Sequence, residues 1–282
     1  MDKPAGPTSH DAVARVRRAL GLRSVGHTGT LDPFASGLLV MLAGRATRLA
    51  RFLDGLPKTY TGVARLGVRT DTDDRTGTPL GEPASLAGID EDRVAAAVNA
   101  MVGSYLQQPP AYSAKKVEGV RSYRRARRGE PVRVQEVPVT VYAAELLGFA
   151  GDRATSRVRV STGTYIRALA RDLGERLGVG AHLAELRRAA IGGLRVEDAV
   201  PLGDVGPGTL LVPLTRVLQH LPAVALDNAQ RSAVRHGRRL RGDGLKPPDA
   251  SEAVVLTAEG DVVAVARAEE GYLQPVVVLE GE

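Results

Sequence analysis

Cysteine and tryptophan are both absent from this chain of 282 residues. Without cysteine there can be no disulfide framework, no iron–sulfur cluster and no thiolate zinc site. No apolar run reaches the roughly 18 residues that a membrane-spanning helix needs, and residues 1–4 lack the apolar segment of a signal peptide. We therefore expect a cytoplasmic protein.

The sequence also lacks the common motifs of nucleotide and metal chemistry. It contains no G-x-x-x-x-G-K-[ST], no G-x-G-x-x-G after a strand, no H-E-x-x-H and no G-x-S-x-G. Nucleotide hydrolysis and the usual metalloprotease chemistry lose their normal support. We expect a protein that uses neither a metal nor a cofactor.

Positive charge, in contrast, is plentiful and concentrated. The whole chain has 38 basic and 32 acidic side chains, a net charge of +6, and residues 115–133 alone carry eight basic and two acidic ones. Tyr112 and Tyr123 lie beside and within this basic segment. Basic runs interleaved with aromatic side chains are typical of RNA contact, although a basic run by itself is more often a solvated helical face. The segment alone leaves both interpretations open.

The charge balance reverses towards the C-terminus, which predicts a second domain. Residues 223–282 hold seven basic and ten acidic side chains, a net −3, so the first 222 residues carry +9. The stretch 201–222 between the two regions is rich in proline and glycine, as a connection would be. We predict a larger domain over 1–215 and a smaller one over 222–282.

Hydrophobic spacing predicts a mixture of helices and strands. Helices are expected from a cap at Ser9 to Gly21, over 45–53, over 90–102 with Asp90 as cap, and over 166–177 with Gly178 as the stop. Strands are expected over 37–43, 60–68, 132–147, 156–161, 253–256, 262–266 and 275–279. This pattern favours an α+β catalytic domain with a largely antiparallel sheet, followed by a small module made only of strands.

One short stretch stands out as a candidate site. In residues 26–39, GHTGTLDPFASGLL, Asp32 follows two glycines, precedes a proline and leads into an apolar run. Such a loop is tightly shaped and can project a carboxylate into a cleft. From spacing alone, however, Asp32 is more simply a turn or capping residue, and His27 a hydrogen-bonded structural histidine.

The same stretch resembles the signature of the TruB family of tRNA pseudouridine synthases, G-H-x-G-x-L-D-P-x-A-x-G-[LV]-L, at every fixed position. The resemblance continues over about residues 1–200. It includes Lys3-Pro4, Lys58-x-Tyr60, Arg65-Leu66-Gly67, Thr70-Asp71-Thr72-x-Asp74, Pro109-x-x-x-Ser113-Ala114-x-Lys116, Gly163-Thr164-Tyr165-Ile166-Arg167 and, near its end, Gly180-Ala181-His182-Leu183-x-x-Leu186-Arg187-Arg188. It implies a catalytic domain of pseudouridine synthase type with a mixed sheet, and a C-terminal PUA-like domain.

The resemblance also implies roles for individual residues. Asp32 matches the catalytic aspartate, which either attacks the target nucleotide or abstracts a ribose proton. Arg167 matches the arginine that pairs with this aspartate, and a cation so close should lower the pKa of Asp32 by roughly 1 to 3 pH units. Tyr60 matches the tyrosine that stacks on the target base and is placed to move the proton at C5.

A second group of residues is implied to bind substrate. Tyr165 and Leu186 match residues that line the uridine pocket, and His27 matches the histidine that enters the tRNA T-loop. Lys3 and Lys116 belong to matched motifs near the RNA. The basic segment lies in an insertion over about 108–135 that, in the family, closes over the T-arm.

These expectations combine into a function. The resemblance implies an enzyme that converts the T-loop uridine at position 55 of tRNA to pseudouridine, with base flipping and without a cofactor. We expect it to act alone, as a monomer, with tRNA as its partner and without contact to a membrane. The alternative is an RNA-binding folding factor that remodels the tRNA elbow, and the presence of both Asp32 and Arg167 favours the enzyme.

Overall fold

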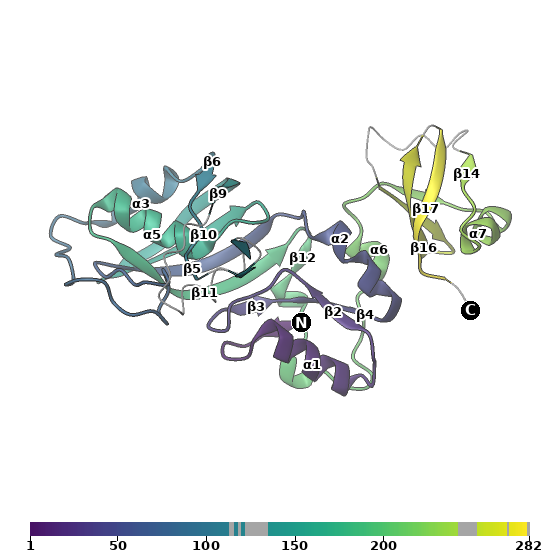
Figure 1. Ribbon diagram of the computed structural model, residues 1–282, viewed down its shortest axis with the longest axis horizontal. Coiled ribbons are helices and arrows are strands. Elements are labelled where there is room, and N and C mark those ends of the chain that lie inside the picture. Colours follow the sequence, from purple (N-terminus) through teal and green to yellow (C-terminus); the bar gives the residue numbers. More distant parts are fainter. Residues whose placement is uncertain (113–115, 118–119, 122–134, 242–252, 270, 281–282) are drawn as a thin grey trace.

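The computed structural model describes residues 1–112, 116–117, 120–121, 135–241, 253–269 and 271–280. Its strands form two separate larger sheets, one in the first two hundred residues and one in the last sixty (Figure 1). Helices and strands are interspersed along the chain, so the predicted α+β class is confirmed.

An eight-stranded sheet forms the body of the larger region. Its order is β1-β3-β11-β5-β10-β9-β6, with β12 paired to β11. The strands are β1 (Asp2–Lys3), β3 (Ser36–Leu38), β5 (Lys58–Leu66), β6 (Gly103–Gln107), β9 (Val137–Ala150), β10 (Arg153–Val160), β11 (Ala181–Ile191) and β12 (Leu194–Arg195). The β11–β3 pair is parallel and the other pairs of this sheet are antiparallel, which confirms the mixed, largely antiparallel sheet.

Short elements surround this sheet. Two small two-stranded sheets pair β2 (Val25–Thr28) with β4 (Val40–Ala43), and β7 (Lys116–Val117) with β8 (Val120–Arg121). The helices of the larger region are α1 (Ser9–Ala19), η1 (Gly44–Leu49), α2 (Ala50–Leu53), α3 (Glu91–Asn99), α5 (Ile166–Leu177), η2 (Val196–Asp198) and η3 (Leu202–Asp204). The expected single helix over 45–53 is thus a 3₁₀ turn that continues into one α-helical turn.

The apolar run 37–43 is not the single strand that its composition predicts. It divides at Leu39 into the end of β3, which joins the large sheet, and β4, which pairs with β2. The cause is Gly37, which has φ +106° and lies so close to β11 that a Cβ atom there would overlap the backbone carbonyl of Arg188. The chain pairs with β11 at Ser36 and Gly37, comes closest to it at the glycine, and turns away after it.

The first helix begins one residue earlier than predicted. Thr8 is its N-cap and forms a capping box with Asp11, whose backbone N–H donates to Thr8 Oγ1 at 3.0 Å. Ser9, the predicted cap, is buried and hydrogen-bonds the loop at Leu31 instead. The helix thereby becomes attached to the segment that carries Asp32.

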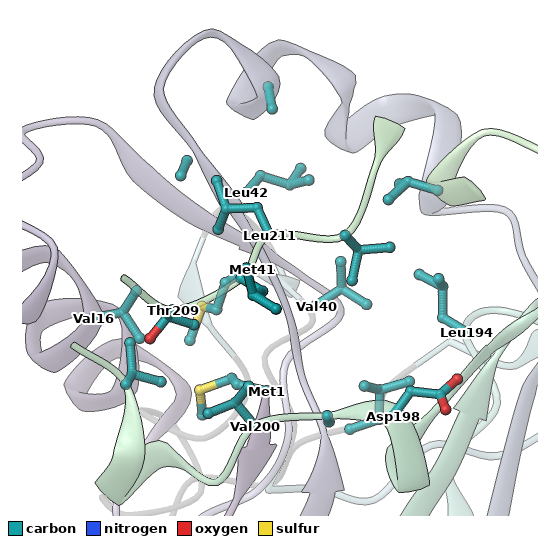
Figure 2. A pocket seen from close by; sticks show the side chains of 18 of the residues that line it. Met1, Val16, Val40, Met41, Leu42, Leu194, Asp198, Val200, Thr209 and Leu211 are labelled. Atoms are coloured by element: carbon teal, nitrogen blue, oxygen red, sulfur yellow. The ribbon is translucent and has the colours of Figure 1, made fainter. Parts of the chain in front are cut away.

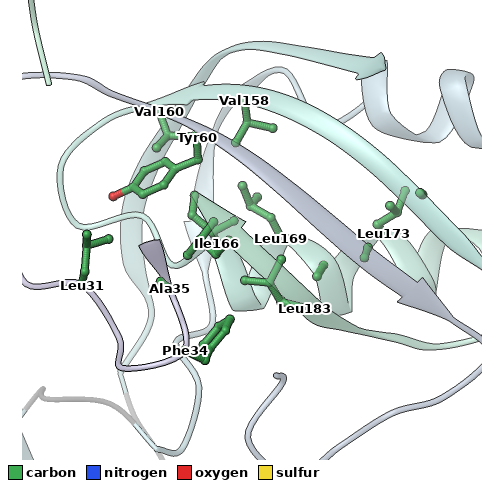
Figure 3. Close-up of a cluster of buried hydrophobic side chains, with 14 of the residues drawn as sticks. Leu31, Phe34, Ala35, Tyr60, Val158, Val160, Ile166, Leu169, Leu173 and Leu183 are labelled. Atoms are coloured by element: carbon green, nitrogen blue, oxygen red, sulfur yellow. The ribbon is translucent and has the colours of Figure 1, made fainter. Parts of the chain in front are cut away.

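Helix α5 agrees with the prediction at both ends. It runs from Ile166 to Leu177, and Gly178 closes it in the left-handed conformation at φ +77°. Its buried face packs against β11 and β5, where Ile166, Leu169 and Leu173 join the main core (Figure 3). This packing fixes the helix that carries Arg167.

The second sheet has five strands in the order β13-β15-β16-β17-β14. They are β13 (Ala223–Ala225), β14 (Leu240–Arg241), β15 (Val254–Ala258), β16 (Asp261–Glu269) and β17 (Tyr272–Val278). The β-rich character agrees with the sequence, but helix α7 (Asn228–Arg235) lies beside the sheet, so a module of strands alone is wrong. The α7 pattern is short and polar, which made it hard to find.

The two regions are in direct contact through α2, η1 and α6 (Leu214–Val217), which lie between them in Figure 1. One apolar cluster spans the junction and includes Leu53 and Val217 from one side and Val265 and Val277 from the other. Arg48 also donates from Nη1 to the carbonyl of Val278 at 3.0 Å. Within the described ranges, no helix is long and apolar enough to cross a membrane.

Candidate active site

The loop between β2 and β3 presents Asp32, and a buried arginine ties its two ends together. Arg188, on β11, donates from Nη2 to the carbonyl of Gly29 at 2.8 Å and from Nε to the carbonyl of Leu38 at 2.7 Å. One planar guanidinium can bind two carbonyls at once because its donors point in fixed directions. The ends of the loop are therefore held at a set distance.

Lys3 also holds the loop that carries Asp32. Its side chain is fully buried, and Nζ donates to the carbonyls of Pro4 at 2.8 Å, Pro7 at 2.9 Å and Pro33 at 3.5 Å. The bond to Pro33 is next to Asp32. Lys3 was predicted to bind substrate, but a buried ammonium with three carbonyl partners holds the loop and is not exposed to a ligand.

Ser9 fixes the centre of the loop. Its hydroxyl donates to the carbonyl of Leu31 at 3.1 Å and accepts from the Leu31 backbone N–H at 2.9 Å. With its neighbours fixed on both sides, Asp32 has little backbone freedom. Its side chain remains 38% exposed, so the carboxylate can meet a ligand.

Arg167 reaches Asp32 from the first turn of α5. Its Nε lies 3.2 Å from Asp32 Oδ2, so the structure brings together the two residues that the sequence paired. The rest of the guanidinium is also occupied. Nη1 donates to Asp74 Oδ2 at 3.1 Å and to the carbonyl of Thr72 at 3.2 Å, and Nη2 donates to the carbonyl of Tyr112 at 3.0 Å.

Asp74 is the buried anchor of this arginine. It is 3% exposed, and its Oδ1 accepts from Thr72 Oγ1 and from the Thr76 backbone N–H, each at 2.9 Å. Oδ2 is left to bind Arg167. A buried carboxylate with this many donors stays oriented, so Arg167 is held on both sides, by Asp74 and by Asp32.

The pKa of Asp32 differs from the sequence-based prediction. Burial raises the pKa of Asp32 and outweighs the attraction of Arg167, which lowers it. The negative charge of Asp74 raises this pKa further, and the positive charge of Lys3 lowers it. The prediction of a lowered pKa is wrong because it counted the nearby arginine without the loss of solvation.

Tyr60 and Leu186 form apolar walls next to the loop. Tyr60 is on β5 and belongs to the same buried cluster as Leu31 and Ala35, the neighbours of Asp32 (Figure 3). Leu186 is buried on the adjacent strand β11, where it pairs in register with Gly62. An aromatic ring and a leucine side chain are the residue types that can bound a pocket for a flat, mostly apolar ring.

Tyr165 occupies the N-cap of α5, two residues before Arg167. The buried Gln107 binds both the N–H and the carbonyl of Tyr165. Its Oε1 accepts from the Tyr165 N–H at 2.9 Å, and its Nε2 donates to the Tyr165 carbonyl at 3.2 Å. The side chain is partly exposed. Gln107 thus fixes the start of the helix on which Arg167 depends.

The remaining predicted residues are placed differently. His27 lies on β2 near the same loop, its pKa is lowered by burial and then by the charge of Arg188, and its Nδ1 finds no hydrogen-bond partner among the residues the structure describes. Lys116 is on β7, but its side chain and most of the predicted insertion over 108–135 lie outside the described residues. The described residues contain no cluster of metal-ligating side chains.

A separate apolar hollow of about 200 Å³ lies away from this loop (Figure 2). It is lined mainly by aliphatic side chains, such as Met1, Val40 and Leu211, and its charged Asp198 is paired with Arg216. Among its other polar lining residues, Thr209 accepts at Oγ1 from the Gly206 N–H at 2.9 Å, and Arg195 is paired with Glu197. The described residues that line the hollow therefore provide a cavity but no free catalytic group.

Three residues of the site were given no role by the sequence. Asp74 and Arg188 entered only as positions of the family motifs, and Gln107 was not singled out. Each acts through a partner far along the chain: Arg167, Gly29 and Tyr165, respectively. Spacing cannot reveal such contacts.

Two family models match the sequence of this chain. Residues 17–166 match the TruB family pseudouridylate synthase (N terminal domain), and residues 167–212 match the tRNA pseudouridylate synthase B C-terminal domain. Together they include Asp32, Tyr60 and Arg167.

Curated relatives match over nearly the whole length. A tRNA pseudouridine synthase B of Leifsonia xyli subsp. xyli (strain CTCB07) is 44% identical over 272 residues, which cover 94% of this chain and 90% of the relative. A protein of the same name from Thermobifida fusca (strain YX) is 44% identical over 290 residues, covering 100% of this chain and 97% of the relative.

Solved structures agree on the fold. A chain of the archaeal box H/ACA sRNP Nop10-Cbf5 complex aligns with a TM-score of 0.72 and 26% identity, covering 99% of this chain and 85% of its own length. A chain of a Cbf5-Nop10-Gar1 complex aligns with the same TM-score at 28% identity, covering 99% of this chain and 82% of its own length.

Proposed function

From the premise that this chain belongs to the TruB family of pseudouridine synthases, we propose that it converts the uridine at position 55 in the T-loop of tRNA to pseudouridine, with Asp32 as the catalytic residue. The observation that carries the proposal is the partly exposed carboxylate of Asp32, held at 3.2 Å from the buried guanidinium of Arg167. The enzyme is an isomerase that needs no cofactor.

The reaction conserves atoms. The N1–C1′ glycosidic bond of uridine breaks, the uracil rotates within the site, and a C1′–C5 bond forms. C5 then loses its proton and N1 gains one, so that substrate and product are isomers. The Asp32 carboxylate serves either as the nucleophile or as the base that takes a ribose proton. Both roles need the ionised form, which Arg167 favours against the effect of burial.

The walls of the site suit the rotating base. Tyr60 can stack on the uracil ring, and its hydroxyl can move the C5 proton once C5 faces C1′. Leu186 and Tyr165 bound the same space from β11 and from the N-cap of α5. Apolar and aromatic walls allow the uracil to turn because they make no directional bonds to it.

Access to the base requires base flipping. A stacked uridine cannot reach Asp32, so the nucleotide must leave its stack at a cost of a few kcal/mol. We assign His27 and the basic insertion, with Lys116, to the contact with the T-arm.

We further propose that the chain acts as a monomer in the cytoplasm and needs no protein partner. The catalytic domain would span 1–215, and residues 222–282 would form a PUA-like domain. The five-stranded sheet at 223–278 supports the second assignment. Mass measurement by light scattering, with and without tRNA, tests the oligomeric state.

Mapping of the product tests the proposed substrate position. Purified protein is incubated with an unmodified tRNA transcript, and pseudouridine is located by carbodiimide modification and primer extension. We expect a single strong stop at position 55 and none in a matched transcript with cytidine at that position. A stop elsewhere, retained in the cytidine transcript, would contradict the proposed position.

A further inference from the structure

Helix α5 carries a second arginine, Arg171, that repeats the arrangement of Arg167 one turn further on. Residues four apart on a helix lie on the same face. Arg171 donates from Nη1 to Asp73 Oδ2 at 2.9 Å and from Nη2 to the carbonyl of Gln108 at 2.9 Å. Arg167 makes the equivalent pair of contacts with Asp74 and with the carbonyl of Tyr112.

The two arginines therefore bind the same two segments. One segment is the turn at Asp73 and Asp74. The other is the stretch 108–112, which leads into the basic segment of the chain. The turn is also held by the bond from Arg167 to the carbonyl of Thr72 and by two backbone bonds to Leu183. Arg171 adds a contact one helical turn away on each segment, which restricts its orientation further.

The turn at Asp73 needs such support. Asp73 has φ +59°, in the left-handed region that most residues avoid, and its carbonyl accepts from the Leu183 backbone N–H at 2.9 Å. A strained backbone persists only where its surroundings fix it. The next residue along is Asp74, so any change at Asp73 displaces the anchor of Arg167.

The pair of Arg171 and Asp73 is shielded from solvent. Their side chains are 18% and 14% exposed, and burial raises the pKa of Asp73. The neighbouring Asp172 also orients the guanidinium of Arg171, because its Oδ1 accepts from Nη2 at 2.8 Å and from Nε at 3.1 Å. A lysine could replace one of these contacts but could not reach Asp73 and Gln108 together.

We propose that Arg171 is a positioning residue for Asp32: it holds the turn at Asp73 and the stretch 108–112 on α5, so that Asp74 keeps Arg167 on the catalytic carboxylate. The inference rests on the proposed function and adds a residue that touches neither Asp32 nor the base. Arg171 thereby holds the stretch that leads into the basic insertion and, through Asp74 and Arg167, helps to position the catalytic aspartate.

The test is tritium release from tRNA labelled at uracil C5, measured in single turnover with enzyme in excess. We expect Arg171→Gln to lower the rate constant by about tenfold or more, because small displacements of a catalytic group are costly. Its affinity for tRNA should stay within about twofold, since the guanidinium of Arg171 is occupied by contacts within the protein. Arg176→Gln, an exposed change on the same helix, should match the wild type.

A rate constant separates positioning from folding. At saturating enzyme, a variant that merely folds poorly still shows the normal rate constant, because its folded fraction remains in excess over the tRNA. Arg171→Lys should recover part of the rate constant, as one contact is regained. An Arg171→Gln rate constant equal to that of the wild type overturns the inference, and so does a loss that disappears at saturating enzyme.

Asp73→Asn provides an independent test, because asparagine tolerates the left-handed backbone and removes only the charge. It should slow the reaction, and adding it to Arg171→Gln should slow the double variant no further. Full additivity, or a normal rate in Asp73→Asn alone, contradicts the inference. If the wild type itself releases no tritium, the proposed function fails; if only the variants behave normally, the function stands and this inference falls.

Discussion

The two sheets of this protein bury their side chains in different ways. In the larger region, buried polar and charged residues are frequent, among them Lys3, Lys58, Asp74, Arg167 and Arg188. In the described part of the C-terminal region, 223–241, 253–269 and 271–280, the buried residues are all apolar. The buried charges of the larger region hold its loops through hydrogen bonds and ion pairs, which the apolar core of the C-terminal region does not require.

This difference indicates that the candidate active site lies in the larger region. Burying a charge costs free energy unless partners compensate, so a region that tolerates many buried charges has been arranged for another purpose. In the larger region the partners are carbonyls of the Asp32 loop and the carboxylate of Asp74. The network holds the partly exposed carboxylate of Asp32 in place. In the described part of the smaller sheet, no buried charged residue holds a carboxylate in this way.

The largest expected effect comes from breaking the network at Arg167. Arg167→Gln should lower the single-turnover rate by about a thousandfold, because it removes the cation beside Asp32 and leaves Asp74 buried without its partner. The measurement is tritium release with Arg176→Gln as the control. A loss smaller than tenfold would show that the network is structural.

The next effect concerns the loop itself. Gly37→Ala should destabilise the protein by about 3 kcal/mol, because the new methyl group meets the backbone of Arg188. Gly6→Ala is the matched control, since its φ of +113° is close to that of Gly37 while no described atom lies within 4 Å of a Cβ atom there. Urea denaturation compares the two. Equal losses would mean that strain, and not the close approach, dominates.

A smaller effect is expected in the C-terminal sheet, where Val263 is fully buried on β16. Val263→Ala should cost about 2 kcal/mol through lost apolar burial and a small cavity. The rate constant of tritium release should not change, because no catalytic contact is touched. A slowed rate constant in the folded variant would contradict the separation of the two regions.

The smallest effect is a shift of pH dependence. Burial raises the pKa of Asp32, so the acid limb of the single-turnover rate should lie above the usual carboxyl value of about 4. Because the folded state then binds the proton more tightly than the unfolded state, the wild type should gain stability relative to Asp32→Asn as pH falls through this limb. An acid limb below the usual carboxyl value would contradict this account.

Local pattern predicted much of this molecule. Helix α5 follows from its apolar spacing and its terminal glycine, and the pairing of Asp32 with Arg167 follows from the family motif. The helix depends on residues near one another in sequence. The pairing depends on a family motif whose members share both the fold and the contact.

The failures have a common physical cause. The run 37–43 divides because Gly37 meets Arg188, 151 positions away, and the pKa of Asp32 rises because distant elements bury it. Ser9 leaves the cap to Thr8 because Leu31 offers a better partner. Each outcome depends on a long-range contact that no local pattern encodes.

The most direct test of the account is release of tritium from unmodified tRNA labelled at uracil C5, with wild type compared with Asp32→Asn and no added cofactor or metal. The account predicts release by the wild type only, while the variant still binds tRNA. Normal release by Asp32→Asn would contradict the assignment of Asp32. No release by a folded wild type that binds tRNA would contradict the proposed activity and favour a role in RNA folding.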